Sequence, residues 1–242
     1  LSKTGSGTLL LSSANTYTGD TRVSAGVLDV QANNAVGSHG RLAISNGASV
    51  LLNDQTTSIS GLDGDVGASL NLGSSTGALN LTGAQTTRFD GDISGTGKLV
   101  LNGTGTQGLG GNNSWLGSTT VNGGTLDLFS ARALPASTTL NIDFPGQVRL
   151  NGFNATVAGL ASTITGGIVD VGNGGTLTVD VASGKTSSYF GDITGQGNLT
   201  MVGAPAPTDV CTGADARAPH DALPVSTYLF GAGAVGGSIN YV

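Results

Sequence analysis

Apolar and polar residues alternate in short runs along most of the chain. Clear examples are RLAIS at 41–45, TLDLFS at 125–130 and QVRLNG at 147–152, where leucine, isoleucine or valine takes every second position. In a β-strand such residues share one face, so each run predicts a strand with one apolar face and one face open to water. Helical spacing of apolar residues at i, i+3, i+4 and i+7 does not recur, and we expect no long helix.

Residues that favour turns separate these runs. Glycine, asparagine, aspartate, serine and threonine bound them, and Asn46–Gly47, Asn122–Gly123 and Gly174–Gly175 are expected to supply turns with positive φ. Short strands at intervals of roughly eight to ten residues are compatible with a sandwich, a barrel, a propeller or a β-solenoid. Strand spacing alone does not choose among these folds.

An internal repeat favours the solenoid. NTYTGDTRVSAGVLDV at 15–30 matches NSWLGSTTVNGGTLDL at 113–128 with an offset of 98 residues, and FDGDISGTGKLVL from Phe89 matches YFGDITGQGNLTM from Tyr189 with an offset of 100. A propeller blade of about 40–50 residues fits such a unit only as two dissimilar blades. A sandwich requires no repeat at all.

We therefore predict an all-β protein whose main part, residues 1–203, is a parallel β-helix. It would consist of two units, at about 5–94 and 95–194. With three strands per rung of roughly 20–30 residues, the repeated part would hold about eight rungs and extend about 40 Å.

Residues 204–242 depart from this pattern. APAPTDVCTGADARAPHDALPV, which begins at Ala204, holds four of the six prolines and the single cysteine. We predict a Pro-rich linker, a cap over the last rung or a non-homologous tail. The stretch 222–242 has no charged residue, but Pro224 and scattered glycines make a membrane-spanning helix a weak interpretation.

Composition excludes several classes of protein. Of the 242 residues 38% are apolar and 10% are charged, and the net charge is −6, which argues against general disorder. Nine scattered lysines and arginines form no basic stripe, so we expect no nucleic-acid partner. Because the chain begins at Leu1 without methionine, it is expected to be a piece of a longer protein.

The repeated motif resembles a known family. GSGTLLLSSANTYTGDTRVSAGVLDV at 5–30 and GTGKLVLNGTGTQGLGGNNSWLGSTTVNGGTLDL at 95–128 resemble the passenger-associated transport repeat of bacterial autotransporters. The second copy inserts about eight residues around Thr106–Asn113 and has Trp115-Leu116 in place of Tyr17-Thr18. Neither change is expected to upset the strand pattern.

The resemblance implies fold, location and partners. It implies a right-handed parallel β-helix that is secreted, or displayed on the surface of a Gram-negative bacterium through the outer-membrane β-barrel translocator of the same parent chain. Host surfaces and like passengers are further candidate partners. The virulence-associated adhesion common in this family would then be the alternative to a structural role.

Residues able to act in catalysis are few. His39 lies in GSHGR, a sequence typical of a surface turn, and His220 and Cys211 lie close together in the Pro-rich tail without a predicted rigid scaffold. The glycines of GTGTQGLGG, from Gly103, resemble a phosphate loop, but no helix pattern follows, so we interpret this stretch as a turn. We predict no catalytic, cofactor-binding or metal-binding residue.

Carboxylates and aromatic residues give the remaining candidates. A carbohydrate-active enzyme would require Asp54, Asp63 and Asp65 to converge in a groove beside a basic residue. We instead favour turn formation at Asp63-Gly64 and Asp90-Gly91, with Asp92 beside the second pair. The matched aromatic residues of the repeat, Tyr17 and Trp115, are expected to pack between rungs or over a turn rather than to stack on sugars.

Three functional hypotheses follow. The first is a non-enzymatic structural segment of an autotransporter passenger, in which each rung buries its apolar face on the one before it and thereby supports export and folding. The second is adhesion or self-association through ladders of serine, threonine and asparagine. The third, which we favour least, is a carbohydrate-active β-helix enzyme.

Overall fold

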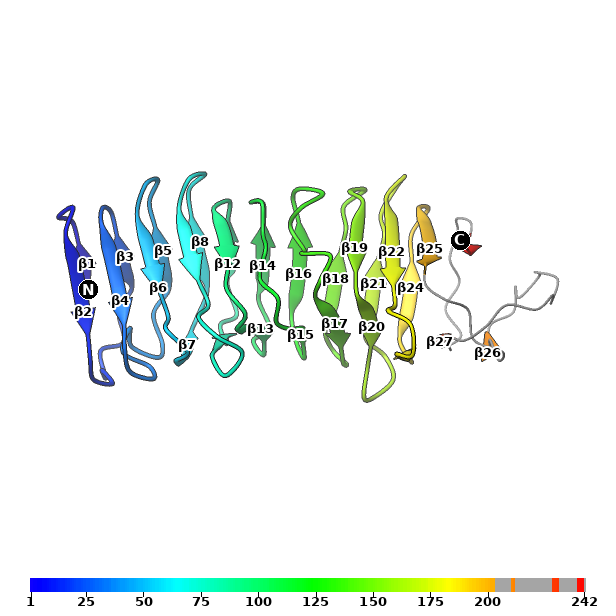
Figure 1. The fold of residues 1–242 in the computed structure, drawn as a ribbon, viewed down its shortest axis with the longest axis horizontal. Helices are drawn as coiled ribbons and strands as arrows, with labels where there is room; N and C mark the ends of the chain where they lie inside the picture. Colours follow the sequence, from blue (N-terminus) through cyan, green and yellow to red (C-terminus); the bar gives the residue numbers. More distant parts are fainter. Residues whose placement is uncertain (203–209, 212–227, 231–238, 242) are drawn as a thin grey trace.

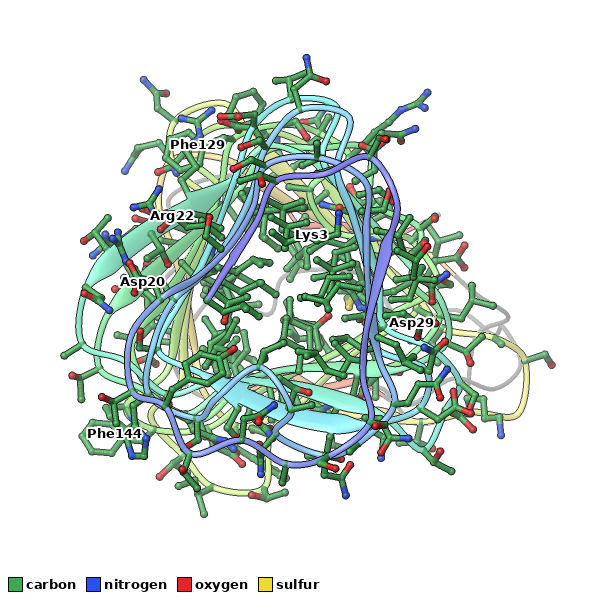
Figure 2. All side chains as sticks on the ribbon, turned by 90° about the vertical axis from the view of Figure 1, so that its left-hand side faces the viewer. Lys3, Asp20, Arg22, Asp29, Phe129 and Phe144 are labelled. Carbon is green, nitrogen blue, oxygen red and sulfur yellow. The ribbon has the colours of Figure 1, made fainter. Side chains whose placement is uncertain are left out.

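The chain winds into a rod of stacked turns with a triangular cross-section (Figures 1 and 2). A computed structural model describes residues 1–202, 210–211, 228–230 and 239–241. Strands of successive turns pair side by side and in parallel. The described residues contain only strands and turns and no helix, as the alternating pattern predicts.

The first face of the rod is one continuous sheet. It has ten strands, one from each turn. In order along the rod they are β1 Ser2–Lys3, β3 Thr21–Val23, β5 Leu42–Ile44, β8 Leu62–Gly64, β11 Thr86–Phe89, β14 Thr106–Leu109, β16 Thr125–Leu128, β18 Gln147–Arg149, β21 Ile168–Asp170 and β24 Asp192–Thr194.

The second face, which the chain enters after the first, is divided into two sheets. The sheet nearer the N-terminus comprises β2 Thr8–Leu11, β4 Val27–Val30, β6 Ser49–Leu51, β9 Ser69–Asn71 and β12 Asp92–Ser94. The sheet nearer the C-terminus comprises β19 Ala155–Val157, β22 Thr176–Asp180, β25 Asn198–Val202 and β28 Ile239–Tyr241.

The third face leads the chain back to the first. Its main sheet comprises β7 Thr56–Ile59, β10 Ala78–Leu81, β13 Lys98–Leu101, β15 Thr119–Val121, β17 Thr139–Ile142 and β20 Gly159–Ala161. A second sheet comprises β23 Ser187–Tyr189, β27 Tyr228–Phe230 and β26 Val210–Cys211.

The number of turns corrects the prediction of about eight. The first face has ten strands, and its successive strands begin about 21 residues apart. A turn is thus at the short end of the range assumed from the sequence. At about 4.8 Å per turn, ten turns give a rod about 50 Å long.

Identical or similar apolar side chains stack along the interior. On the second face Leu28, Val50, Leu70 and Ile93 occupy one inward position in consecutive turns, and each is at most 4% exposed. This stacking is the physical basis of the alternating pattern, because the inward residue of every turn buries against its counterparts above and below.

Turn glycines follow the prediction in two of three cases. Gly47 and Gly174 have positive φ, of 75° and 80°. In the third pair, Asn122–Gly123, neither residue has positive φ. The next residue, Gly124, has it instead, at 62°. A Cβ at Gly124 would also collide with the backbone of the preceding turn at Gly105, so both conformation and space favour glycine there.

The two copies of the repeated sequence do not lie on the same faces. β3 of the first face corresponds to β15 of the third, β4 of the second face to β16 of the first, and β7 of the third face to β19 on the second. Because a turn takes about 21 residues, an offset of 98 residues advances the chain by four turns and two further faces. The second copy is therefore rotated about the rod axis relative to the first.

The insertion in the second copy changes the strand pattern, contrary to our expectation. Residues Thr106–Leu109 form β14, an additional strand that pairs with β11 and β16 in the first face. The first copy passes from β2 to β3 without a strand between them, whereas the second passes from β13 through β14 to β15. The insertion thus adds a strand of the first face between the two halves of the motif.

Most of the predicted tail, 204–242, lies outside the described residues, including His220. Its described parts are short strands: β28 pairs with β25, and β27 pairs with β23 and β26. Cys211 belongs to β26. In the part of the chain that the structure describes, no helix is long and apolar enough to cross a membrane.

Candidate functional site

The repeated motif forms a junction that bonds adjacent turns to each other. In the first copy, Asn15 Nδ2 donates a hydrogen bond to the carbonyl of Ala35 in the next turn, at 2.6 Å. The hydroxyls of Tyr17 and Thr21 are 2.5 Å apart, and Thr21 Oγ1 donates to the carbonyl of Val36 at 3.1 Å. Burial raises the pKa of Tyr17 more than the hydrogen bond with Thr21 lowers it.

The second copy repeats this arrangement and extends it. Asn113 Nδ2 donates to the carbonyl of Ala133 in the next turn, at 2.9 Å, and its Oδ1 accepts the backbone N–H of Ile93 in the preceding turn, at 2.8 Å. Trp115 Nε1 donates to Thr119 Oγ1 at 3.2 Å. Asn113 therefore joins three consecutive turns.

Threonine continues the junction toward the next turn. Thr119 is fully buried, and its hydroxyl lies 3.0 Å from that of Thr138. Thr138 Oγ1 is also 2.8 Å from the carbonyl of Gly117. Where the chain crosses a face without a strand, no neighbouring strand pairs with its buried backbone groups. The asparagine and threonine side chains hydrogen-bond to these groups instead.

The aromatic residues pack as predicted. Trp115 is fully buried within the solenoid core, and Tyr17 is half-buried in the first turns. We did not predict the role of the threonines, although Thr21 and Thr119 recur at the same offset of 98 residues. That recurrence was the available signal.

The three carboxylates of the enzyme hypothesis do not converge. Asp54 lies in the turn between β6 and β7, where it accepts the backbone N–H of Ser74. Asp63 lies on the first face in β8, and Asp65 follows that strand and accepts the backbone N–H of Asn46 at 3.3 Å. The three carboxylates thus lie at different positions around the rod, and each has its own structural partner.

The interpretation of Asp63-Gly64 as a turn is wrong, because both residues lie within β8. Gly64 is required for packing instead: the ring of its strand neighbour Phe89 occupies the space that a Cβ on Gly64 would need. Asp90-Gly91 does form the bend between β11 and β12, as predicted.

The other candidates have structural surroundings. The stretch from Gly103 is a turn only at its start, and our interpretation of it as a turn is wrong for the residues that form β14. Asp92, at the start of β12, accepts the backbone N–H of Asn112 at 2.8 Å. His39 is exposed in a bend, with Nδ1 2.8 Å from the hydroxyl of Ser38.

Charged side chains on the first face pair between turns. Arg41 forms ion pairs with Asp20 at 3.0 Å in the preceding turn and with Asp63 at 3.2 Å in the following one. The backbone N–H of Arg41, and then its guanidinium, hold the pKa of Asp20 below its ordinary value. Pairs as exposed as these contribute little stability individually.

Farther along the same face, an arginine stacks on an aromatic ring. The Arg88 guanidinium lies 3.9 Å from the centre of the Phe129 ring and pairs with Asp90 at 2.8 Å. Phe129 covers Gly108, where a Cβ would lie 2.9 Å from the ring. Figure 2 shows Phe129 at the corner where the first face ends.

Asp127, on β16, is the least satisfied carboxylate among the described residues. Its Oδ1 is buried and has no hydrogen-bond partner among them, and the nearest guanidinium nitrogen of Arg149 is 3.8 Å away. Burial raises the pKa of Asp127 more than Arg149 and Asn151 lower it.

Gln107 is a buried polar residue that sequence reasoning missed. Its Oε1 accepts the backbone N–H of Leu62 at 3.0 Å and the hydroxyl of Thr87 at 2.7 Å, while Nε2 donates to the carbonyls of Leu62 and Gly108, both at 2.9 Å. β8 and β11 pair only at Phe89 and Gly64, so β11 does not pair with Leu62. The Gln107 amide bonds the backbone of Leu62 instead. Glutamine at an inward position of an alternating strand was the signal.

These features define the class of the protein: an extended parallel β-solenoid in which a repeated polar and aromatic junction connects successive turns. Comparison with known sequences identifies a family with such repeats. A family model described as passenger-associated-transport-repeat matches residues 1–30 and 94–128. These two ranges contain the junction residues from Asn15 to Thr21 and from Asn113 to Thr119.

A similar protein is known among autotransporters. Over 215 residues the chain is 38% identical to the "Adhesin BmaC autotransporter" of Brucella suis biovar 1 (strain 1330). The similarity covers 86% of this chain and 6% of that protein. No solved structure matches the chain.

The chain is therefore autotransporter passenger sequence, as its motifs indicated. Passengers of this type are secreted or displayed at the cell surface. Because the chain spans about 6% of the relative's length, the similarity describes one segment of a far longer protein.

Proposed function

We propose that this segment is a non-enzymatic, self-stacking part of a passenger, whose repeated junctions lock each new turn onto the one before it during export and folding. The observation that supports this proposal is Asn113, which bonds both to Ile93 in the preceding turn and to Ala133 in the following one. A turn that closes in this way resists reopening, so folding can proceed along the rod.

The stacking also fits a structural role energetically. Inward side chains contact their counterparts in the adjacent turns, and the interior is one continuous cluster of buried residues. In a solenoid each repeat is stabilised mainly by its neighbours, and folding can begin at one end and propagate. Folding outside the membrane would then discourage the chain from sliding back.

Surface display of the parent protein tests this proposal. The double variant Asn113→Ala/Thr119→Val removes the junction bonds without opening a large cavity, and Ser114→Ala is a matched control, because its exposed side chain makes no hydrogen bond within the described residues. We expect the double variant to reduce protease-resistant passenger at the cell surface several-fold. Deletion of residues 95–128, which removes β13 to β16, should reduce it further.

The control variant should display normally. Display and protease resistance equal to the parent in both the double variant and the deletion would refute a role in export and folding.

Adhesion is a second candidate, favoured by the similarity to a protein named as an adhesin. The outer faces present polar ladders, for example Thr156, Thr178 and Thr200 at one position in successive turns of the second face. Such ladders can hydrogen-bond to a host surface or to a like passenger. Binding of the purified chain to host cells, and aggregation of cells that display the parent, test the two forms of this candidate separately.

A further inference from the structure

The second face has a hollow where its two sheets are interrupted. The N-terminal sheet ends at β12 and the C-terminal sheet begins at β19. Between them two turns cross this face without a strand, at residues 110–118 and 129–138. The second of these turns leaves a hollow of about 300 Å³ beside β19.

One side of the hollow is apolar. Leu134 and Pro135 line it and are themselves buried, and the methyl groups of Ala131 and Ala136 lie at its border. Surfaces of this kind contact the C–H face of a sugar ring or another small apolar group. The apolar side alone does not select a ligand.

The polar side is selective because its unused groups are hydrogen-bond donors. Asn154 Oδ1 already accepts the backbone N–H of Thr176 at 3.0 Å, and Asn112 Oδ1 accepts Arg132 Nη1 at 3.3 Å. Both amide Nδ2 groups are therefore left to donate, with no acceptor for them among the described residues. The hydroxyl of Thr156 adds a group that can donate or accept.

Among the described residues that line the hollow, Arg132 alone is charged. None of the ion pairs found in the described part of the chain includes Arg132, and its Nη2 and Nε find no acceptor there. The carboxylate bonded to this segment, Asp92, has Oδ1 directed at the backbone N–H of Asn112. The hollow thus combines a guanidinium that forms no ion pair within the described residues with a surplus of hydrogen-bond donors.

We propose that this hollow binds one carboxylate-bearing sugar unit of a glycan. The carboxylate would pair with Arg132, whose planar guanidinium can hold both oxygens. Hydroxyl and ring oxygens would accept from Asn112 and Asn154, and the C–H face would lie on Pro135. A volume of about 300 Å³ is at the lower end of ligand sites, which suits a single unit.

This proposal deepens the adhesive candidate and rests on it for its biological role. Binding itself is measured on the purified chain, whereas export is measured on cells. A failure to bind would therefore leave the structural proposal intact, and failed export would leave the binding result intact.

The test is titration of the purified 242-residue chain with methyl β-D-glucuronide, followed by NMR or calorimetry. A ligand of this size, at about 0.3 kcal/mol for each non-hydrogen atom, would have a dissociation constant on the order of 1 mM. The probes for comparison are methyl β-D-glucoside, which has the same ring without the carboxylate, and sodium acetate, which has the carboxylate without the ring. We expect both to bind at least tenfold more weakly than the glucuronide.

Three variants identify the site. Arg132→Gln removes the charge, and Asn154→Asp keeps the acceptor for Thr176 but replaces the free donor with a negative oxygen. Both should weaken glucuronide binding at least tenfold. Arg22→Gln is the matched control, because Arg22 is an exposed arginine on the first face, outside the hollow, and its loss should change nothing.

Three results would overturn the proposal. The first is no binding of the glucuronide at a concentration ten times the expected dissociation constant. The second is binding of acetate as tight as that of the glucuronide, which would show an adventitious ion only. The third is an equal loss of glucuronide affinity in Arg22→Gln and Arg132→Gln. Circular dichroism of each variant confirms that the solenoid is intact, so that weaker binding is assigned to the site.

Discussion

The junction makes a quantitative prediction at Trp115. The side chain is fully buried, and its Nε1 donates to Thr119. Replacement of a buried tryptophan by alanine removes its transfer free energy and leaves a cavity, which together cost about 3–5 kcal/mol. Thr119 retains its contact with Thr138, so no unpaired group is added to that cost. We therefore expect Trp115→Ala to lower the free energy of unfolding by about 4 kcal/mol.

The first copy supplies a matched control. Tyr17 occupies the equivalent position but is only half-buried and lies in the first turns of the rod. Tyr17→Ala should cost about 1–2 kcal/mol, from partial burial and one hydrogen bond. Trp115→Phe keeps most of the volume and loses the hydrogen bond to Thr119, so we expect a cost of about 1 kcal/mol beyond the change in shape.

Urea unfolding followed by far-UV circular dichroism measures these differences. The chain has a single tryptophan, so tryptophan fluorescence cannot follow the alanine variant. Trp115 lies in the middle of the rod and should affect the main transition, whereas loss of Tyr17 can open the first turn alone. A cost for Trp115→Ala below 1 kcal/mol, or one equal to that of Tyr17→Ala, would refute the assignment of Trp115 as a central packing residue.

Four further predictions concern polar and glycine positions. Gln107→Leu should lower the free energy of unfolding by about 2–4 kcal/mol, because it leaves buried backbone groups without partners, and denaturant titration measures this. Gly64→Ala should cost about 1–3 kcal/mol by collision with the Phe89 ring, and adding Phe89→Leu should restore part of that loss in a double-mutant cycle. The folded-state pKa of Asp127 is raised, so its ionised form opposes folding: Asp127→Asn should be more stable than the parent chain at pH 7, with the advantage vanishing as the pH falls below the ordinary value of 3.8. The folded-state pKa of Asp20 is lowered, so Asp20→Asn should be less stable than the parent chain at pH 7. This difference in stability should disappear as acid protonates Asp20 in the parent. Equal dependence of stability on pH in Asp127→Asn and Asp20→Asn would contradict this reasoning.

The fold could be predicted because its information is local and repeated. Strands such as β5 and β16 alternate between buried and less buried residues at the positions that the sequence indicated. The packing of Tyr17 and Trp115 could also be predicted, since a purely superficial role would not require an aromatic at the same place in both copies. Family resemblance then gave the class of protein, which the comparisons support.

The site residues were harder to predict because their partners are distant in sequence. Gln107 bonds to Leu62 across 45 residues, and Asn113 bonds to residues 20 positions away in both directions. Asp63-Gly64 has the sequence of a turn, but its conformation depends on Phe89 in the next turn. A local propensity is overridden where a neighbouring turn supplies both pairing and bulk.

The sequence by itself determined which residues face inward, that the chain is all β, and that one junction occurs twice. These properties depend on a period of two residues and on the recurrence of a motif, both of which are visible along the chain. Only the tertiary structure decided on which face each copy lies. The face on which a residue lies depends on the number of residues in all the turns before it. The few residues that form β14 were therefore enough to add a strand and to change the faces on which the second copy lies. The same winding left the second face without strands between β12 and β19, and so created the hollow beside Arg132.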